Sequence, residues 1–359
     1  MDARPKAIWR EWETGDSMAT PTLADIAKRV GVSTAAVSIA LNKGETTRVS
    51  AKTRQRILKA AEEMSYSPNE LAKALAENRT RLLGLIVPLR DPIFFNSFIA
   101  QALSGIQSTL MRRGYNLLVY SPTGQNGMIA RDKVYESKFI DGIIFVNTRS
   151  CSANTVNETI RDLQAAKVKF SMINSYYGRA PINYVGVDDA AIGAAAADYL
   201  VGKGHRRIAF LSGTHTLPGH MQLVKGLERG LRKHELELPE TMIGCTEYDR
   251  DQAFAILDRW FQHKSHRPSA ILAADDQLLM HLYDYADLRK FTIPDDVSVL
   301  ARRNIGIEDH IRPRPTSIVI PTFEMGQLAA DLLISSIEDV KHEPRRVMLP
   351  FQLIEGATV

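Results

Sequence analysis

The sequence predicts two kinds of folded unit: a small all-α head at the N-terminus and a larger α/β core of two parallel-sheet lobes. Two short helices hinged on one glycine begin at residue 22, in the stretch "TLADIAKRVGVSTAAVSIALN". From residue 82 onward, short apolar runs alternate with helical stretches, an order that implies parallel strands with right-handed crossovers. A chain of 359 residues has room for two or three such units.

The composition narrows the class of protein. No apolar run approaches the roughly 20 residues that span a bilayer, and the opening "MDARPKAIWREWETGDS" lacks the apolar stretch of a secretory signal. The two cysteines, Cys151 and Cys245, stand far apart, which favours a reducing cytoplasm. The net charge is +4, but residues 20–81 carry eleven Lys and Arg against six Asp and Glu. A basic head on a nearly neutral body is typical of nucleic-acid-binding proteins.

The head has the capping and apolar spacing of a helix-turn-helix followed by a third helix. Thr22 begins a Thr-x-x-Asp capping box, and Gly31 can adopt the left-handed conformation that ends a helix. Ser33 caps the second helix, and Ser50 caps a third over about 51–64. We expect one small core from the apolar residues Leu23, Ile26, Ala27, Val30, Val37, Ala40, Leu41, Ile57, Leu58, Ala61 and Met64. A second helix that begins with small side chains is typical of a recognition helix in a DNA groove.

Several of these stretches resemble one known family. "TLADIAKRVGVSTAAVSIALN" and "VSAKTRQRILKAAEEMSYSPNELAKAL" are similar to the DNA-binding head and hinge of the lactose-repressor (LacI) family of bacterial transcription regulators. "VGVDDAAIGAAAADYLVGKGHRRIAFLSG" and "IPDDVSVL" resemble the effector-binding core of that family, which is related to periplasmic sugar-binding proteins. The resemblance implies a helix-turn-helix domain at 20–66, a hinge at 67–81 and a core at 82–359, with lobe one at about 82–183 and 320–346 and lobe two at about 184–319 and 347–359. Residues 1–19 match nothing in the family, so we expect a disordered extension, or a true start at Met18.

The resemblance also assigns DNA-contacting roles by position. Residues of the second helix would face base edges, namely Thr34, Ala35 and Ile39. Phosphates would be held by Thr22, Ser33, Ser38 and Asn42. Ile39 departs from the polar or basic residue often found there: its side chain cannot hydrogen-bond a base, but it can pack on a thymine methyl. Ile39 therefore either contacts thymine or only packs on the head's own scaffold.

The hinge is expected to form a short helix in "NELAKALA", residues 69–76, that is marginal in water by itself. In the family this helix forms on DNA, paired with that of the dimer mate. By position, Ala72 and Leu75 would lie in the minor groove, with Leu75 wedged between base pairs. Partial unstacking costs a few kcal/mol, but a bent duplex contacts more protein. The alternative for Leu75 is an ordinary apolar residue of a linker helix.

The effector would bind at the carboxyl ends of strands, between the lobes. The resemblance implies a site lined by Phe98, Leu217, Gly219, Leu223, Tyr248, Asp276 and Arg303. Arg303 stands where the family usually has an aspartate, within Ala301-Arg302-Arg303 in place of Gly-Tyr-Asp. A guanidinium only donates hydrogen bonds and prefers carboxylate or phosphate. Two hypotheses follow: Arg303 clamps an anionic effector, or it makes an internal ion pair, leaving no small ligand or a partner protein as regulator.

Candidate motifs for dinucleotide binding and for metal binding lack the residue spacing that these sites require. "GKGHRR" at 202–207 lies between a helix and a strand, whereas a dinucleotide fingerprint joins a strand to a helix. The pairs His215/His220 and His263/His266 lack further ligands at metal-binding spacing. We therefore predict no enzyme, no cofactor and no metal.

The predicted function is a cytoplasmic, DNA-binding transcription repressor. It would act on a near-palindromic operator as a homodimer or a dimer of dimers, because two-fold symmetry in the protein is matched by the DNA. A small-molecule effector would control it, as inducer or corepressor. The alternative is a solute-binding module of transport without a DNA function.

Overall fold

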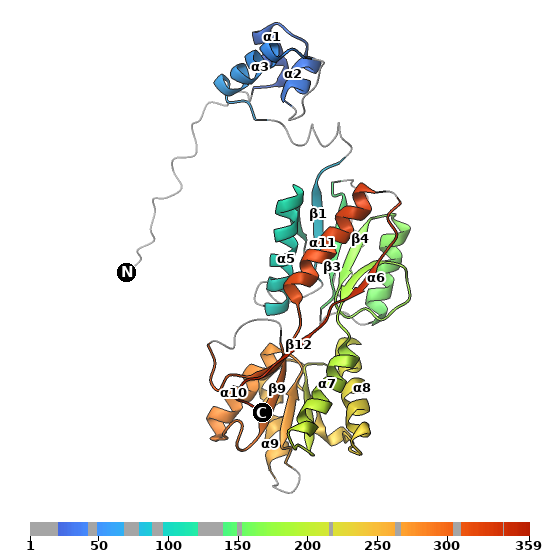
Figure 1. Cartoon of the computed structure of the whole chain (residues 1–359), viewed down its shortest axis with the longest axis vertical. Helices are drawn as coiled ribbons and strands as arrows, with labels where there is room; N and C mark the ends of the chain where they lie inside the picture. Colours follow the sequence, from blue (N-terminus) through green and yellow to red (C-terminus); the bar gives the residue numbers. More distant parts are fainter. Residues whose placement is uncertain are drawn as a thin grey trace, which may run out of the picture. The chain divides into compact units, whose positions relative to one another are not determined.

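The computed structural model describes residues 21–41, 49–67, 79–87, 96–120, 139–148, 153–214, 218–262, 267–303, 310–339 and 341–359. The chain divides into two compact units, Met1–Asn78 and Arg79–Val359, and the division falls within the segment expected to be the hinge. Both units appear in Figure 1. Within the described ranges, no helix has both the length and the apolar character needed to cross a membrane.

Three helices make up the described part of the head: α1 (Leu23–Val30), α2 (Thr34–Leu41) and α3 (Ala51–Glu63). Their ends follow the caps in the sequence. Thr22 and Asp25 form the complete capping box, and Gly31 ends α1 with φ +75°. The Oγ atoms of Ser33 and Ser50 each accept a backbone N–H in the first turn of α2 and α3, at 3.2 Å. The helix boundaries are therefore set by local chemistry.

The head is held together by a small apolar cluster of Ile26, Ala27, Val30, Val37, Ala40, Ile57, Ala60 and Ala61. Leu23, Leu41 and Met64 pack half-buried at its edge. The placement of Leu58 in this core was wrong, because its side chain is 44% exposed. Ile57 already faces inward, so the residues three and four positions later, Ala60 and Ala61, share its face. Leu58 is rotated about 100° away from that face.

The core contains two six-stranded sheets, one in each lobe. The sheet of lobe one has the order β11-β5-β4-β3-β1-β2, and all its pairings are parallel. Its strands are β1 (Leu82–Ile86), β2 (Asn116–Tyr120), β3 (Gly142–Val146), β4 (Phe170–Ile173), β5 (Asn183–Gly186) and β11 (Arg346–Met348). The parallel α/β lobe predicted from the sequence is confirmed.

The sheet of lobe two has the order β12-β10-β9-β8-β6-β7. Its strands are β6 (Ile208–Ser212), β7 (Ile243–Cys245), β8 (Ala270–Ala273), β9 (Ser298–Arg303), β10 (Thr316–Val319) and β12 (Gln352–Ile354). The final strand, β12, runs antiparallel to β10, a departure from the all-parallel sheet expected. After β11 the chain enters lobe two at the carboxyl end of that sheet and forms β12 directly, without a helix in between, so β12 runs in the opposite direction to β10.

The helices flank these sheets in close pairs. The described helices of the core are α5 (Ser97–Arg113), α6 (Ala153–Ala165), α7 (Asp189–Gly202), α8 (Pro218–Lys233), α9 (Arg250–Phe261), α10 (Asp276–Arg289) and α11 (Thr322–Glu338), with a 3₁₀ turn at Glu240–Met242. Figure 1 shows α5 beside α11 and α7 beside α8. A Cβ added at Gly226 of α8 would lie 2.0 Å from the Ala190 carbonyl oxygen of α7. Only glycine allows this approach, which fixes α8 where its first turn reaches lobe one.

The described chain crosses between the lobes three times. It leaves lobe one after β5, leaves lobe two after β10 to form α11 and β11, and returns to add β12. The boundaries suggested by the sequence, near 183 and 346, fall inside β5 and β11, and both strands continue in lobe one to Gly186 and Met348. The carboxyl ends of the strands in both lobes lead toward these crossings.

Candidate functional site

The start of α2 presents a free face to solvent. Thr34 and Ala35 are exposed, whereas Val37 and Ala40 are buried in the head's core. Ile39 and Ser38 are half-buried. Ile39 therefore has surface to offer a partner while it also packs within the head. Asn42, the remaining residue predicted on this element, lies outside the described residues.

Thr22 and Ser33, both predicted phosphate contacts, cap helices. The Thr22 hydroxyl donates to Asp25 Oδ2 at 2.7 Å, so its proton is already used inside the capping box. Hydrogen bonds from Thr22 also lower the pKa of the Asp25 carboxyl below its usual range. A carboxylate at this point repels phosphate, whereas Ser33 only accepts from the Ala36 N–H and keeps its own proton to donate.

The basic residues of the head divide into two groups. Arg54 and Arg56 donate to backbone carbonyls of the helix-turn-helix, and Arg29 pairs with Glu63 at 2.6 Å. These arginines brace the three helices. The exposed lysines of the described head, Lys28, Lys52 and Lys59, make no ion pair within the described ranges. They are available to phosphates, and sequence reasoning did not single them out. The hinge residues Ala72 and Leu75 lie outside the described ranges.

The two lobes touch through polar side chains. Ser97, at the start of α5 in lobe one, donates to Asp276 Oδ2 at the start of α10, at 3.0 Å. Tyr177, between β4 and β5, donates to Asp189 Oδ2 at 2.5 Å. Together with the contact of Gly219 described below, these interactions define the lobe junction.

Gly219 explains why α8 can start so close to lobe one. A Cβ added there would lie 2.5 Å from Ser175 Oγ and 3.1 Å from Asp189 Oδ2. By the family resemblance, Gly219 was expected in the effector site, at a position where polar residues commonly stand. The structure gives it a steric role at the lobe junction.

Asp189 is the centre of the most buried charged group at the junction. Arg302 Nη2 lies 3.0 Å from Asp189 Oδ1, and the two residues are 8% and 1% exposed. Burial and the neighbouring Asp189 charge raise the pKa of the Tyr177 hydroxyl, so Tyr177 acts as a donor. Sequence reasoning missed this cluster because its members come from distant stretches of the chain.

Arg303 lies on the opposite side of β9 from Arg302, since successive strand residues alternate. It is 0% exposed, and its Nε donates to Ser317 Oγ at 2.5 Å. The nearby Tyr283 donates to the Pro313 carbonyl, and burial raises the pKa of its hydroxyl to about 12, while the Arg303 charge acts in the opposite direction. A ligand could reach the Arg303 guanidinium only if this packing opened.

The other predicted effector residues differ in accessibility. Phe98 and Tyr248 are half-buried, and the Tyr248 ring lies against the backbone of Gly213. Leu223 has no exposed surface and belongs to the apolar core, because its face of α8 points at the sheet. The ligand-contacting role expected of Leu223 is therefore not supported. Leu217 lies outside the described residues.

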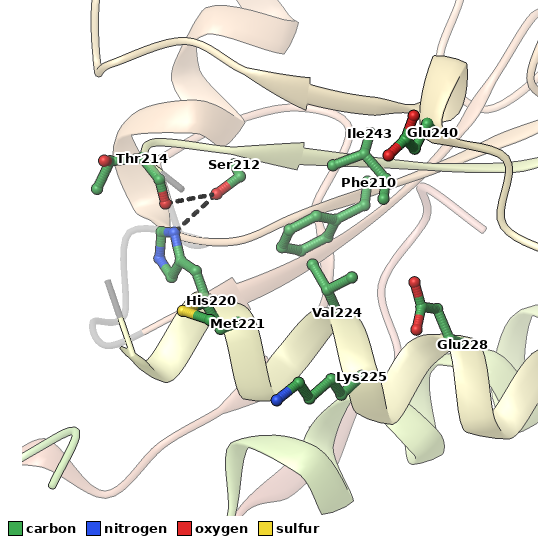
Figure 2. Close-up of a pocket in the computed structure, with 10 residues that line it drawn as sticks. All are labelled: Phe210, Ser212, Thr214, His220, Met221, Val224, Lys225, Glu228, Glu240 and Ile243. Carbon is green, nitrogen blue, oxygen red and sulfur yellow. Dashed lines mark hydrogen bonds between the residues drawn. The ribbon is translucent and has the colours of Figure 1, made fainter. Parts of the chain in front are cut away.

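A pocket of about 490 Å³ lies in lobe two, between α8 and the edge of the sheet (Figure 2). Its lining residues are Phe210, Ser212, Thr214, His220, Met221, Val224, Lys225, Glu228, Glu240 and Ile243. At one end His220 Nδ1 and Ser212 Oγ are 2.8 Å apart. Burial lowers the pKa of His220, so the imidazole is neutral at pH 7. The described residues contain no cluster of metal-binding side chains.

Comparison with known proteins decides the family. Residues 22–69 match "Bacterial regulatory proteins, lacI family", and residues 197–359 match a "Periplasmic binding protein-like domain". The chain belongs to the lacI family. It is 28% identical over 342 residues to the HTH-type transcriptional repressor PurR of Vibrio atlanticus, covering 94% of this chain and 98% of that one. Members of this family are transcription regulators and not enzymes, as predicted.

Solved structures of family members share the fold. The lac repressor dimer bound to operator and the anti-inducer ONPF matches with a TM-score of 0.79 at 21% identity, over 94% of this chain and 98% of that one. The complex of the transcriptional regulator CelR with cellobiose matches with a TM-score of 0.69 at 23% identity, over 94% and 100%. The predicted architecture of a helical head and two parallel-sheet lobes is thereby confirmed.

Proposed function

We propose that this DNA-binding transcription regulator is a repressor that acts in the cytoplasm, as a homodimer or dimer of dimers, on a near-palindromic operator. The observation that carries the proposal is the start of α2, where Thr34 and Ala35 are exposed while Val37 and Ala40 hold the helix to the head. A helix fixed on one side and free on the other can enter a major groove without unfolding. The lac repressor dimer bound to operator, which shares the fold, is consistent with this arrangement.

Within the head, Thr34, Ala35 and Ile39 would read bases, and Ser33, Ser38 and Asn42 would hold phosphates. The exposed Lys28, Lys52 and Lys59 would add sequence-independent attraction to the backbone. Thr22 is a weaker candidate, because a phosphate would compete with Asp25 for its proton. The half-buried Ile39 supports an apolar contact with a thymine methyl. In the hinge, Ala72 and Leu75 would enter the minor groove.

The effector would be a small polar molecule that bridges the lobes near Ser97, Phe98, Tyr248 and Asp276. Hydroxyl and carboxylate groups at this junction suit a ligand that donates and accepts hydrogen bonds, as sugar hydroxyls do. The complex of CelR with cellobiose supports a neutral sugar as the first class to test. An anionic effector held by Arg303 lacks support, since that guanidinium is enclosed and bonded to Ser317.

Binding of the full-length protein to genomic fragments tests the DNA function. We expect sequence-selective binding. The logarithm of its association constant should fall steeply and linearly with the logarithm of the salt concentration. Footprinting then locates the operator. Replacing a half-site thymine by uracil removes only a methyl group, so a weakened complex identifies the Ile39 contact. Salt-insensitive or unselective binding would contradict the proposal.

A thermal-shift screen of neutral sugars and sugar acids tests the effector. We expect a neutral sugar to stabilise the protein, and Asp276→Asn to reduce the shift. If an acid bound best and lost its affinity in Arg303→Ala, the anionic hypothesis would replace this one.

A further inference from the structure

The pocket between α8 and the sheet edge has the size and lining of a ligand site that the proposed function does not use. Pockets for small molecules commonly enclose about 300–1,000 Å³, and this one encloses about 490 Å³. All its lining residues lie between Phe210 and Ile243, so lobe two forms it alone. The effector proposed above instead needs residues from both lobes. The pocket shares no lining residue with the proposed effector site, although its His220 end lies beside Tyr248, with the two ring centroids 6.4 Å apart.

The walls of the pocket are apolar in the middle. Phe210 of β6 and Ile243 of β7 form one side, and Val224 of α8 faces them (Figure 2). β7 is the edge strand of its sheet, so within the described ranges no further strand pairs with it beside Ile243. A flat apolar group placed between Val224 and Ile243 would be removed from water on both faces, which favours binding by about 25 cal/mol per Å² buried.

Two carboxylates stand at one end of this apolar slot. Glu228 projects from α8 and Glu240 from the 3₁₀ turn on the opposite wall, both toward the same end of the pocket (Figure 2). Neither carboxylate makes a hydrogen bond or ion pair with the residues that the structure describes. Lys225 also lines the pocket, but its ammonium points away from Glu228 in Figure 2. Two unpaired carboxylates around one space attract a cation that can donate to both.

We propose that lobe two carries a second small-molecule site, which binds an amine with a flat apolar body. The ammonium would donate to Glu228 and Glu240, and the apolar body would lie between Val224, Phe210 and Ile243. His220 and Ser212 close the other end and offer one polar contact there. The charge of the ligand, more than its shape, sets the specificity of this site.

Isothermal titration calorimetry of the full-length protein with 2-phenylethylamine tests the proposal. The matched ligands carry the same phenylethyl group: 2-phenylethanol, which is neutral, and 3-phenylpropanoate, which is anionic. We expect the amine to bind at least tenfold more tightly than the alcohol, and the anion not to bind. We also expect Glu228→Gln/Glu240→Gln to weaken amine binding at least tenfold. Because both side chains lack partners in the described structure, the double variant should keep its fold, which circular dichroism checks.

Two control variants separate this site from others. Glu237→Gln removes an exposed carboxylate nearby but outside the pocket, and amine affinity should stay within twofold. Asp276→Asn alters the lobe junction and should also leave it within twofold. The proposal is overturned if the amine does not bind at millimolar concentration, if the anion binds as tightly, if the double variant binds normally, or if Asp276→Asn abolishes binding.

Discussion

The polar residues at the start of α2 and those at the lobe junction differ in how many contacts they make within the fold. Thr34 is exposed, and its hydroxyl bonds to no residue in the described part of the chain. Asp189 is 1% exposed and is held by Tyr177 and Arg302. A substitution at Thr34 can change recognition alone, whereas one at Asp189 changes stability with it. Operator specificity can therefore diverge within this fold more freely than the contacts that join the lobes.

The largest effect that this comparison predicts is at the junction. Asp189→Ala should lower the free energy of unfolding of the core by about 3–5 kcal/mol, because it leaves the Arg302 charge buried and unpaired. Urea unfolding of Arg79–Val359 measures it. Asp198→Ala, at an exposed ion pair with Lys233, is the control and should cost no more than about 1 kcal/mol. Equal losses in the two variants would show that burial does not set the difference.

Acid should weaken lobe two, where the buried His220 lies at one end of the pocket. Burial lowers the pKa of His220 in the folded state, partly offset by Asp275 and Asp189 and reinforced by Arg302. The unfolded chain therefore binds more protons below about pH 6.5, so stability falls as the pH falls. At pH 5.5 this group can remove at most about 1.4 kcal/mol relative to pH 7.5. His220→Gln should reduce the difference between the two pH values, and an unchanged difference would assign it to other groups.

Loss of a helix cap in the head should lower the free energy of unfolding less than loss of Asp189 does. Thr22→Ala removes the capping box of α1 and should lower the free energy of unfolding of the head by about 1 kcal/mol. Thr22→Ser keeps the hydroxyl and should recover most of the loss. Thermal melting of Met1–Asn78, followed by circular dichroism, measures both. A full loss in Thr22→Ser would mean that the methyl group, and not the cap, was responsible.

The smallest effect on stability is expected at Thr34, on the exposed face at the start of α2. Thr34→Ala should change the free energy of unfolding of the head by less than about 0.5 kcal/mol. It should nevertheless weaken operator binding by about 1 kcal/mol, through the loss of one hydrogen bond. Fluorescence anisotropy with a footprinted operator gives the affinity. If stability fell and affinity did not, the two regions would not differ as described.

The same contrast explains what the sequence could predict. The helices of the head depend on caps and apolar spacing within a few residues, so Thr22, Gly31 and Ser33 mark their ends correctly. Leu58 was misplaced because two adjacent apolar residues, Ile57 and Leu58, leave the rotation of the helix undecided. The alternation of strands and helices likewise predicted two parallel-sheet lobes, but not the reversed β12.

The residues around the lobe junction were harder to predict. A strand alternates its faces, but the sequence does not say whether Arg302 or Arg303 lies on the face where the buried charged group of the junction forms. That choice depends on the pairing with Asp189, which lies far away in the chain. The pocket beside α8 was missed for a different reason. Its lining residues lie close together in the sequence, but the pocket depends on β7 being the edge strand next to that helix, and the order of strands in a sheet is not read from such a short stretch.

The three passages of the chain between the lobes also bear on how the molecule resists proteases. A single cut at 187–188 would leave β11 and α11 of the C-terminal fragment interlocked with the sheet of the N-terminal fragment. The nicked product should therefore migrate as one body in a native gel and separate only in denaturant. Survival of the gene's product in the cell would then depend on global unfolding more than on the exposure of any one connection.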